Sequence, residues 1–286
     1  MERKVTVAAV NFQTAWGDKR ANLEKMKNIV TQAASRGIDM VAFPELALSG
    51  YECDEGCHVH KELAEPIPGP STEEMAKLAA EHNLYVVFGL PEQDSREPTK
   101  RYISTAVVGP EGILGAYRKI HLSEPPLFTE SECFVGGREL PVFKTRFCPI
   151  GIQICYDFWI FPELTRILTL KGAEIVINTT ASPAGPGKPY YLVQQTGARA
   201  TENTIYTISA NLVGQERKRS FYGHSAVAGP DPPRPARIFA EGGETEEVVS
   251  ATLNLEATRW WRQTTGWMRA RRAEIILNEL KSLCKE

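Results

Sequence analysis

Short apolar segments alternate with amphipathic helical segments, and this alternation constrains the fold of the chain most strongly. Residues 4–12 are rich in Val and Ala and predict a buried strand, whereas residues 22–34 carry apolar side chains at helical spacing. Residues 39–43 predict a second apolar strand, which Pro44 ends. Because strands followed by helices favour a sheet covered by helices, this order predicts an α/β protein with a mixed sheet or two sheets.

The same alternation continues along most of the chain, with a hairpin expected around the turn at residues 109–112. Further strands are predicted over residues 84–89, 102–108, 113–119, 147–154, 174–178, 204–211, 225–228 and 248–255, and further helices over residues 71–82, 161–170 and 190–203. Ser71 is the expected N-cap of its helix, with Glu74 at capping-box spacing. No clear linker interrupts this pattern, so we expect one domain over residues 1–255 and a mostly helical tail over residues 256–286.

The charges are nearly balanced, since 33 Lys and Arg residues face 35 Asp and Glu residues for a net charge of -2. A nucleic-acid or membrane-surface binder needs a basic excess, so neither partner is expected. No apolar run approaches the roughly 20 residues of a membrane helix, and the N-terminus lacks a signal-peptide pattern. Six cysteines are too few for a disulfide scaffold in a chain of this length. We therefore expect a reducing, cytoplasmic location in which thiols stay free.

Three chemically useful side chains lie where predicted strands end. Cys155 precedes a helix whose N-terminus would favour the thiolate, although a lone cysteine is more commonly a buried structural residue. Glu45 is embedded in apolar sequence, and burial would make it a base near neutrality. Lys119 is suited to stabilising charge on a carbonyl oxygen, although most lysines are simply solvated. Because strand ends converge on one edge of an α/β sheet, we expect the three residues to meet there.

This set of motifs, in this order, resembles the nitrilase superfamily of carbon–nitrogen hydrolases over about residues 4–255. The matching stretches are Phe-Pro-Glu-Leu-Ala-Leu-Ser-Gly-Tyr at 43–51, Tyr-Arg-Lys-Ile-His-Leu at 117–122, Gly-Ile-Gln-Ile-Cys-Tyr-Asp at 151–157 with Pro162-Glu163, Asn-Thr-Thr-Ala-Ser-Pro at 178–183, Ala-Arg-Ala-Thr-Glu-Asn at 198–203 and the strand from Ser209 through Asn211. Any one of these motifs is weak, but together they make the resemblance strong.

The resemblance implies a four-layer α-β-β-α sandwich with a Glu-Lys-Cys triad. In that pattern Glu45 is the general base and Cys155 is the nucleophile. Lys119 and the backbone amide of Tyr156 would stabilise the oxyanion. The resemblance also implies a thioester acyl-enzyme and no cofactor.

The family often uses a second glutamate shortly after the lysine. Glu130 fits that pattern, since Phe128 precedes it and Phe-Val-Gly-Gly follows at 134–137. Glu124 and Glu132 remain open as alternatives. By the same resemblance, the expected substrate-pocket residues are Tyr51, Phe128, Tyr156, Trp159 and Asn178.

The residues after the cysteine bear on the substrate. True nitrilases usually carry Trp-Glu there, whereas this chain has Tyr156 and Asp157, which is similar to the amidase and N-carbamoyl-amine hydrolase branches. We therefore expect a linear carboxamide substrate, cleaved to a carboxylate and ammonia. Residues 158–161 are Phe-Trp-Ile-Phe and favour an apolar or aromatic acyl group over an anionic one. N-carbamoyl-amine hydrolase and nitrilase activities remain alternatives, as does a non-catalytic binding or assembly protein.

Four possible metal ligands lie within eight residues, at Cys53, Cys57, His58 and His60. Structural zinc sites usually draw ligand pairs from two separated elements, so we expect a polar loop here and no metal. A metalloprotein built on these residues is the alternative.

The tail combines arginine with tryptophan, at Arg259, Arg262, Arg269, Arg271, Arg272, Trp260, Trp261 and Trp267. This composition is typical of a subunit interface, and proteins of the resembled family usually dimerise. We therefore expect a homodimer or a larger homo-oligomer. A nucleic-acid-binding or membrane-binding tail is the alternative.

Overall fold

The computed structural model describes residues 3–125 and 128–283, and two mixed six-stranded sheets form its centre. The first sheet has the order β14 (Glu247–Asn254), β1 (Lys4–Asn11), β2 (Met40–Ala42), β3 (Tyr85–Gln93), β4 (Arg101–Gly109) and β5 (Gly112–Arg118). The second has the order β13 (Arg234–Glu241), β12 (Ala226–Asp231), β9 (Tyr206–Asn211), β8 (Ile175–Thr180), β7 (Pro149–Ile154) and β6 (Val142–Lys144). In each sheet the central strands run parallel, β1 with β2 and β3, and β7 with β8 and β9.

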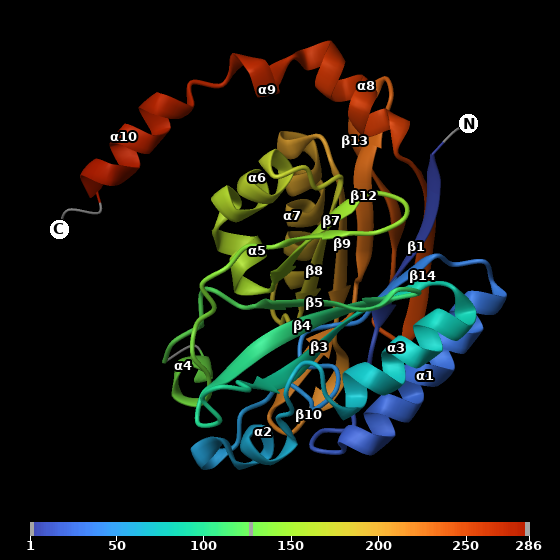
Figure 1. Ribbon diagram of the computed structural model, residues 1–286, viewed down its shortest axis with the longest axis vertical. Coiled ribbons are helices and arrows are strands. Elements are labelled where there is room, and N and C mark those ends of the chain that lie inside the picture. The colour runs from blue at the N-terminus through green and yellow to red at the C-terminus, as the bar shows by residue number, and fades with distance from the viewer. Residues whose placement is uncertain (1–2, 126–127, 284–286) are drawn as a thin grey trace.

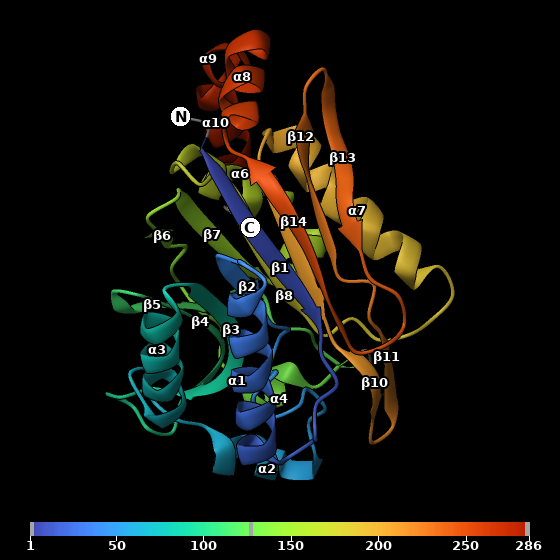
Figure 2. The same ribbon diagram turned by 90° about the vertical axis from the view of Figure 1, so that its right-hand side faces the viewer.

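Helices cover the outer face of each sheet, while the inner faces pack on each other (Figures 1 and 2). The first sheet carries α1 (Lys19–Ser35) and α3 (Pro70–His82). The second carries α5 (Tyr156–Ile160), α6 (Pro162–Leu170) and α7 (Lys188–Asn203). These layers form the four-layer α-β-β-α sandwich that the sequence predicts.

The core lies between the two sheets and beneath the helices. Parallel strands covered on both faces carry near-continuous apolar runs, as in Val7 and Val10 on β1 and Ile152 and Ile154 on β7, all of which are fully buried. Burying each such side chain contributes about 1.5–3 kcal/mol. Rigid strands fixed in this way determine where the residues that follow them must lie.

Most predicted elements are present with small shifts at their ends, but the cap of α3 differs from the prediction. Gly69 is the N-cap, and its N–H donates to the Thr72 hydroxyl at 2.8 Å. Ser71 instead donates through its N–H and hydroxyl to the Glu65 carboxylate, at 2.8 and 3.0 Å. The helix begins one residue earlier than predicted because Pro70, with its fixed φ angle, suits the first helical position.

Several elements are too short or too polar to give the apolar periodicity that predicts strands and helices. The missed strands are β6, β13, β10 (Val213–Glu216) and β11 (Arg219–Tyr222), and the missed helices are η1 (Glu55–Cys57), α2 (His58–Leu63), α4 (Glu130–Cys133) and α5. Strand β13 is an edge strand with mostly exposed side chains, and it begins next to prolines. Edge strands need no continuous apolar run, because water covers one side of them.

The tail is helical, as predicted, and leads away from the sandwich (Figure 1). It contains α8 (Glu256–Thr265), α9 (Trp267–Ala270) and α10 (Ala273–Leu283). Cys284 and the end of the predicted tail lie outside the described residues. Among the residues that are described, no helix has the length and apolar character to cross a membrane.

Two cysteines form a disulfide, which joins Cys57 to Cys133 with a Cα–Cα distance of 5.5 Å. The expectation that thiols stay free is therefore wrong for this pair. The two residues are 76 positions apart in sequence, and only the tertiary fold brings η1 and α4 together. The other cysteines with described side chains are free thiols: Cys53, Cys148 and Cys155.

Candidate active site

Glu45, Lys119 and Cys155 meet at one end of the sandwich, each shortly after a strand ends. Glu45 follows β2, Lys119 follows β5, and Cys155 follows β7. Lys119 Nζ lies 2.7 Å from Glu45 Oε1, and neither side chain reaches the solvent. The Cys155 thiol and the Glu45 carboxylate are close enough to influence each other's pKa, and the second Glu45 oxygen accepts the Ala181 N–H at 3.0 Å. The strand ends therefore converge as predicted.

Glu130 completes the buried cluster on the other side of Lys119. Its Oε1 lies 2.7 Å from Lys119 Nζ and accepts the Tyr51 hydroxyl at 2.5 Å. Its Oε2 accepts the Ser123 N–H at 2.9 Å. The alternatives, Glu124 and Glu132, are both exposed. The structure thus places Glu130, and neither alternative, in the cluster.

Burial controls the protonation of this cluster. It raises the pKa of Glu45, Lys119 lowers it and the Glu130 charge raises it, and the net pKa is about 7. Burial would lower the pKa of Lys119, but the charges of Glu130 and Glu45 outweigh it and hold that pKa well above the usual value. Lys119 is therefore a permanent cation, whereas Glu45 changes its charge near neutral pH.

Cys155 differs from the prediction in its protonation. Burial and then the Glu45 charge raise the pKa of its thiol to about 12, although Lys119 opposes them. The expected thiolate at the helix N-terminus is therefore wrong for the resting site. Helix α5 has only five residues, so its dipole is too short to offset burial beside a carboxylate. The thiol needs a base at the moment of reaction.

The backbone of Cys155 is held in a strained conformation. Its φ of 47° and ψ of -102° lie outside the regions that side chains other than glycine usually adopt. Such residues cost on the order of 1–3 kcal/mol and persist only where their surroundings fix them. The Cys155 N–H donates to Asn178 Oδ1 and to the Thr179 carbonyl, each at 3.0 Å. Strand β8 thus holds the turn that presents the thiol.

Asp157 connects the lysine segment to the cysteine segment, a role that the sequence motif did not reveal. Its buried carboxylate accepts the Tyr117 hydroxyl at 2.6 Å and the Ile120 and His121 N–H groups at 3.1 and 2.9 Å. Tyr117 lies two residues before Lys119 and Ile120 lies directly after it, whereas Asp157 lies two residues after Cys155. The signal that could have indicated this role was one acidic residue within an otherwise aromatic and apolar run.

We expect Asp157→Asn to lower the free energy of unfolding by about 2–3 kcal/mol, because an amide nitrogen would face buried donors. Urea unfolding measures this loss. Asp231→Asn is the control, since Asp231 forms a surface ion pair with Arg237 at 3.1 Å and such pairs contribute about 0–1 kcal/mol. Equal losses in the two variants would contradict a linking role for Asp157.

The predicted pocket residues fall into two groups. Tyr51 and Phe128 pack edge to face at 5.9 Å, beside a small pocket that Glu130 and Arg219 also line. The Arg219 guanidinium lies 4.6 Å from the centre of the Phe128 ring. This group forms the Glu130 side of the site.

The second group lies on the Cys155 side. Trp159 is buried on α5 and packs on Tyr191 at 5.8 Å, and its indole N–H has no hydrogen-bond partner among the residues that the structure describes. Tyr156 packs edge to face on Phe161 at 5.4 Å. Asn178 is fully buried, and its side chain holds the Cys155 N–H. Its contact is therefore with the backbone of Cys155.

The possible metal ligands do not converge. Cys57 is bonded to Cys133, and His60 is fully buried with Nε2 3.1 Å from the Gly50 carbonyl oxygen. Within residues 3–125 and 128–283, no group of three or more His, Cys, Asp or Glu side chains is placed to hold a metal ion. The expected polar loop is also wrong, because this segment forms η1 and α2 and buries Cys57 and His60.

Comparisons with known proteins agree with this geometry. The family model described as carbon-nitrogen hydrolase matches residues 6–263. A nitrilase of Pyrococcus abyssi is 36% identical over 90% of this chain and 91% of its own, and the omega-amidase NIT2 of Xenopus tropicalis is 34% identical over 92% and 94%. A carbon-nitrogen hydrolase structure from Helicobacter pylori G27 superposes with a TM-score of 0.84, at 25% identity, over 98% of this chain and 99% of its own. The chain therefore belongs to the carbon–nitrogen hydrolases of the nitrilase superfamily and is a hydrolase acting on carbon–nitrogen bonds.

Proposed function

We propose that this enzyme is a cysteine amidohydrolase that cleaves a linear carboxamide to a carboxylate and ammonia through a thioester acyl-enzyme. One observation carries the proposal: the buried Glu45 carboxylate lies 2.7 Å from the Lys119 ammonium group and beside the Cys155 thiol, whose pKa it raises. A nucleophile, a proton acceptor and a fixed positive charge are the groups that acyl transfer requires.

In the proposed first step, the Cys155 sulfur attacks the amide carbonyl carbon while Glu45 takes the thiol proton. Because the thiol pKa is far above that of Glu45, the proton must move as the carbon–sulfur bond forms. The ammonium group of Lys119 has three N–H donors, and its two carboxylate partners use two of them. The third is available for the developing oxyanion, together with the Tyr156 backbone N–H.

In the proposed second step, Glu45 returns its proton to the departing nitrogen, the carbon–nitrogen bond breaks, and ammonia leaves. The acyl group is then a thioester on Cys155. Glu45 next takes a proton from water as the water oxygen attacks the thioester carbonyl carbon. Breakage of the carbon–sulfur bond releases the carboxylic acid, and the proton on Glu45 restores the thiol. The reaction consumes one amide and one water and needs no cofactor.

The substrate class is proposed from the residues around Cys155. Trp159 and its neighbour Phe158 form an apolar cluster that contacts Cys155, and this cluster suits an apolar or aromatic acyl group. The relatives include both a nitrilase and an omega-amidase, so nitrile and N-carbamoyl-amine hydrolysis are the competing outcomes.

Ammonia release from a panel of aliphatic and aromatic amides, N-carbamoyl amines and nitriles tests the proposal, with Cys155→Ala as the blank. Turnover of amides supports the amidase assignment. Turnover confined to carbamoyl compounds or nitriles would move the assignment to those branches. Absence of turnover together with slow labelling of Cys155 by iodoacetamide would favour a non-catalytic binding or assembly protein.

The pKa of Glu45 predicts the pH dependence. Below about pH 7 Glu45 is protonated and unable to accept the thiol proton. We expect kcat/KM to rise with pH through about 7 and then level off, because Cys155 keeps its proton up to about pH 12. Initial rates between pH 5 and 9 measure this profile. An acid limb near the ordinary pKa of a glutamate, or a fall in rate just above neutrality, would contradict the assignment.

We also propose that the chain forms a homodimer or a larger homo-oligomer through its tail and acts in the cytoplasm. Helix α10 exposes a row of large apolar side chains: Ile275, Ile276, Leu277, Leu280 and Leu283. The double variant Ile276→Glu and Leu280→Glu should shift the light-scattering mass towards the 31.8 kDa of one chain. Lys281→Glu, which changes charge alone, should not. A wild-type mass of one chain would overturn the assembly proposal.

A further inference from the structure

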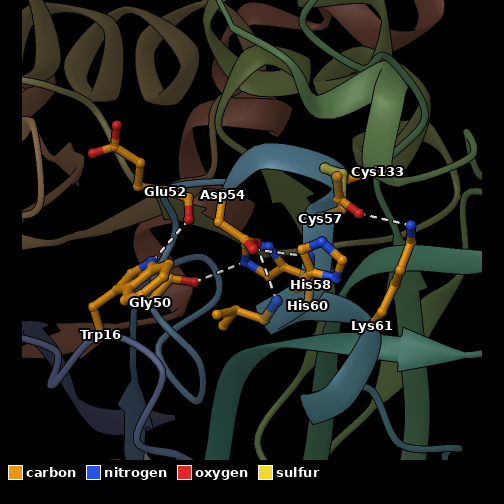
Figure 3. The surroundings of a disulfide bond; sticks show 11 residues. Trp16, Gly50, Glu52, Asp54, Cys57, His58, His60, Lys61 and Cys133 are labelled. Carbon is orange, nitrogen blue, oxygen red and sulfur yellow. Dashed lines mark hydrogen bonds between the residues drawn. A yellow bond between two sulfur atoms is a disulfide. The ribbon is translucent and has the colours of Figure 1, made fainter.

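We propose that the Cys57–Cys133 disulfide and His60 form a brace that positions Glu130, so that reduction of the disulfide slows turnover. This inference rests on the proposed amidase function. We call these three residues the brace. They lie next to α4, the helix that begins at Glu130 of the Glu45, Lys119 and Glu130 cluster. Figure 3 shows the disulfide beside His60.

The position of Glu130 depends on a very short helix. Glu130 is the first residue and Cys133 the last residue of α4, which has four residues. A single helical turn is unstable in isolation, because the conformational entropy lost in forming the first turn outweighs the stabilisation from its one hydrogen bond. The disulfide attaches this turn covalently to Cys57, where η1 meets α2. Residues three apart lie on the same side of a helix, so the bond holds the side of α4 that carries Glu130.

His60 adds two noncovalent contacts, one to the segment that follows α4 and one to the segment that precedes Tyr51. Its ring is fully buried and lies 5.2 Å from that of Phe134, the residue after Cys133. Its Nε2 lies 3.1 Å from the carbonyl oxygen of Gly50, the residue before Tyr51. The Tyr51 hydroxyl in turn donates to Glu130. Helix α2 therefore contacts both the segment that carries Glu130 and the segment that carries its hydrogen-bond donor.

Reduction would remove the covalent part of the brace. A dithiol supplies two electrons and two protons, the sulfur–sulfur bond breaks, Cys57 and Cys133 become thiols, and the reductant becomes a cyclic disulfide. The turn is then held by noncovalent contacts alone: the Glu130 carboxylate's own bonds to Lys119, Tyr51 and Ser123, and the Ser131 N–H to the Ser123 carbonyl at 3.4 Å. A displacement of about 1 Å at a positioning group is enough to cost up to about 10²-fold in rate.

The brace should affect the pH dependence of the reaction, which a merely structural bond would leave unchanged. The charge of Glu130 raises the pKa of Glu45, while Lys119 lowers it. If Glu130 moves away from Lys119, both changes favour ionised Glu45: one negative neighbour is lost, and Lys119 is no longer shared. The acid limb of kcat/KM should therefore move to lower pH as kcat falls.

The test compares wild-type enzyme before and after treatment with dithiothreitol, and after reoxidation with a low-molecular-weight disulfide. Peptide mapping verifies the Cys57–Cys133 bond in each state. We expect reduction to lower kcat at least about tenfold, with the acid limb moved to lower pH, and reoxidation to reverse both changes. Because no residue is substituted, a failure of a variant to fold does not affect this comparison.

Two variants separate the brace from other thiol effects. The double variant Cys57→Ser and Cys133→Ser should behave like reduced wild type and should no longer respond to dithiothreitol. Cys148→Ala, at a buried free thiol outside the brace, should respond as wild type does.

The proposal is overturned if the bond is present but its reduction changes neither kcat nor the acid limb, or if mapping finds no bond. The rate at which iodoacetamide labels Cys155 provides a readout that needs no substrate. If no amide is turned over, the proposed function fails, whereas a labelling rate that still changes on reduction would support the brace independently.

Discussion

Cys155→Ala should abolish turnover of every amide that the wild-type enzyme hydrolyses. The proposed reaction forms a covalent bond to sulfur, and no other nucleophile lies in the described cluster, where Glu45 and Lys119 are already paired. The expected loss is complete within the detection limit of an ammonia assay. Intact-mass analysis during turnover should find the acyl mass on wild-type protein and none on the variant.

Cys148→Ala is the matched control, because that cysteine is also buried and free but lies at the start of β7, at the other end from Cys155. We expect it to keep its activity and its acyl adduct. Residual turnover in Cys155→Ala above the level of a mock purification would mean that the nucleophile is misassigned. An acyl mass mapped to a different residue would have the same meaning.

Glu45→Gln should lower kcat/KM by about 10²–10⁴-fold, the usual effect of removing a general base. Glutamine keeps the size of the side chain, but its single amide oxygen is able to accept from only one of the two donors, Lys119 or Ala181, and it is unable to take the thiol proton. Because the Cys155 thiol has a pKa of about 12, almost no thiolate forms without that base. The remaining activity should rise steadily with pH instead of levelling off above pH 7.

Glu92→Gln controls for the loss of a buried carboxylate paired with a cation. Glu92 is also buried, and it pairs with Arg118 outside the Glu45 cluster. This variant should lose stability but keep the pH profile of the wild type. If Glu45→Gln retained the wild-type profile with its limb near 7, another group would be the base.

The α/β class was predictable because its signals are local, whereas the four-layer sandwich came from the family resemblance. Residues 4–12 and 147–154 are apolar almost throughout, as strands between covered faces must be, and they became β1 and β7. The site was predictable in its members for a related reason. The positions of Glu45, Lys119 and Cys155 follow from the ends of strands, and parallel strands of a layered α/β fold bring their ends to one edge.

The electrostatics of the site were not predictable from sequence. The position of Cys155 before a helix favoured a thiolate, but burial beside the Glu45 carboxylate raises the thiol pKa instead. The energy of a charge depends on the dielectric and on the neighbours around it. Those neighbours come from strands and loops that are distant in sequence.

The sequence by itself determined the α/β class, the order of the main strands and helices and the set of groups at the strand ends, because hydrophobic periodicity and strand ends act over a few residues. Only the tertiary structure decided which side chains share protons and bonds. It paired Cys57 with Cys133 across 76 positions, and it placed Glu130, instead of Glu124 or Glu132, against Lys119. Contacts between distant segments arise from packing in three dimensions, and no local pattern of residues records them.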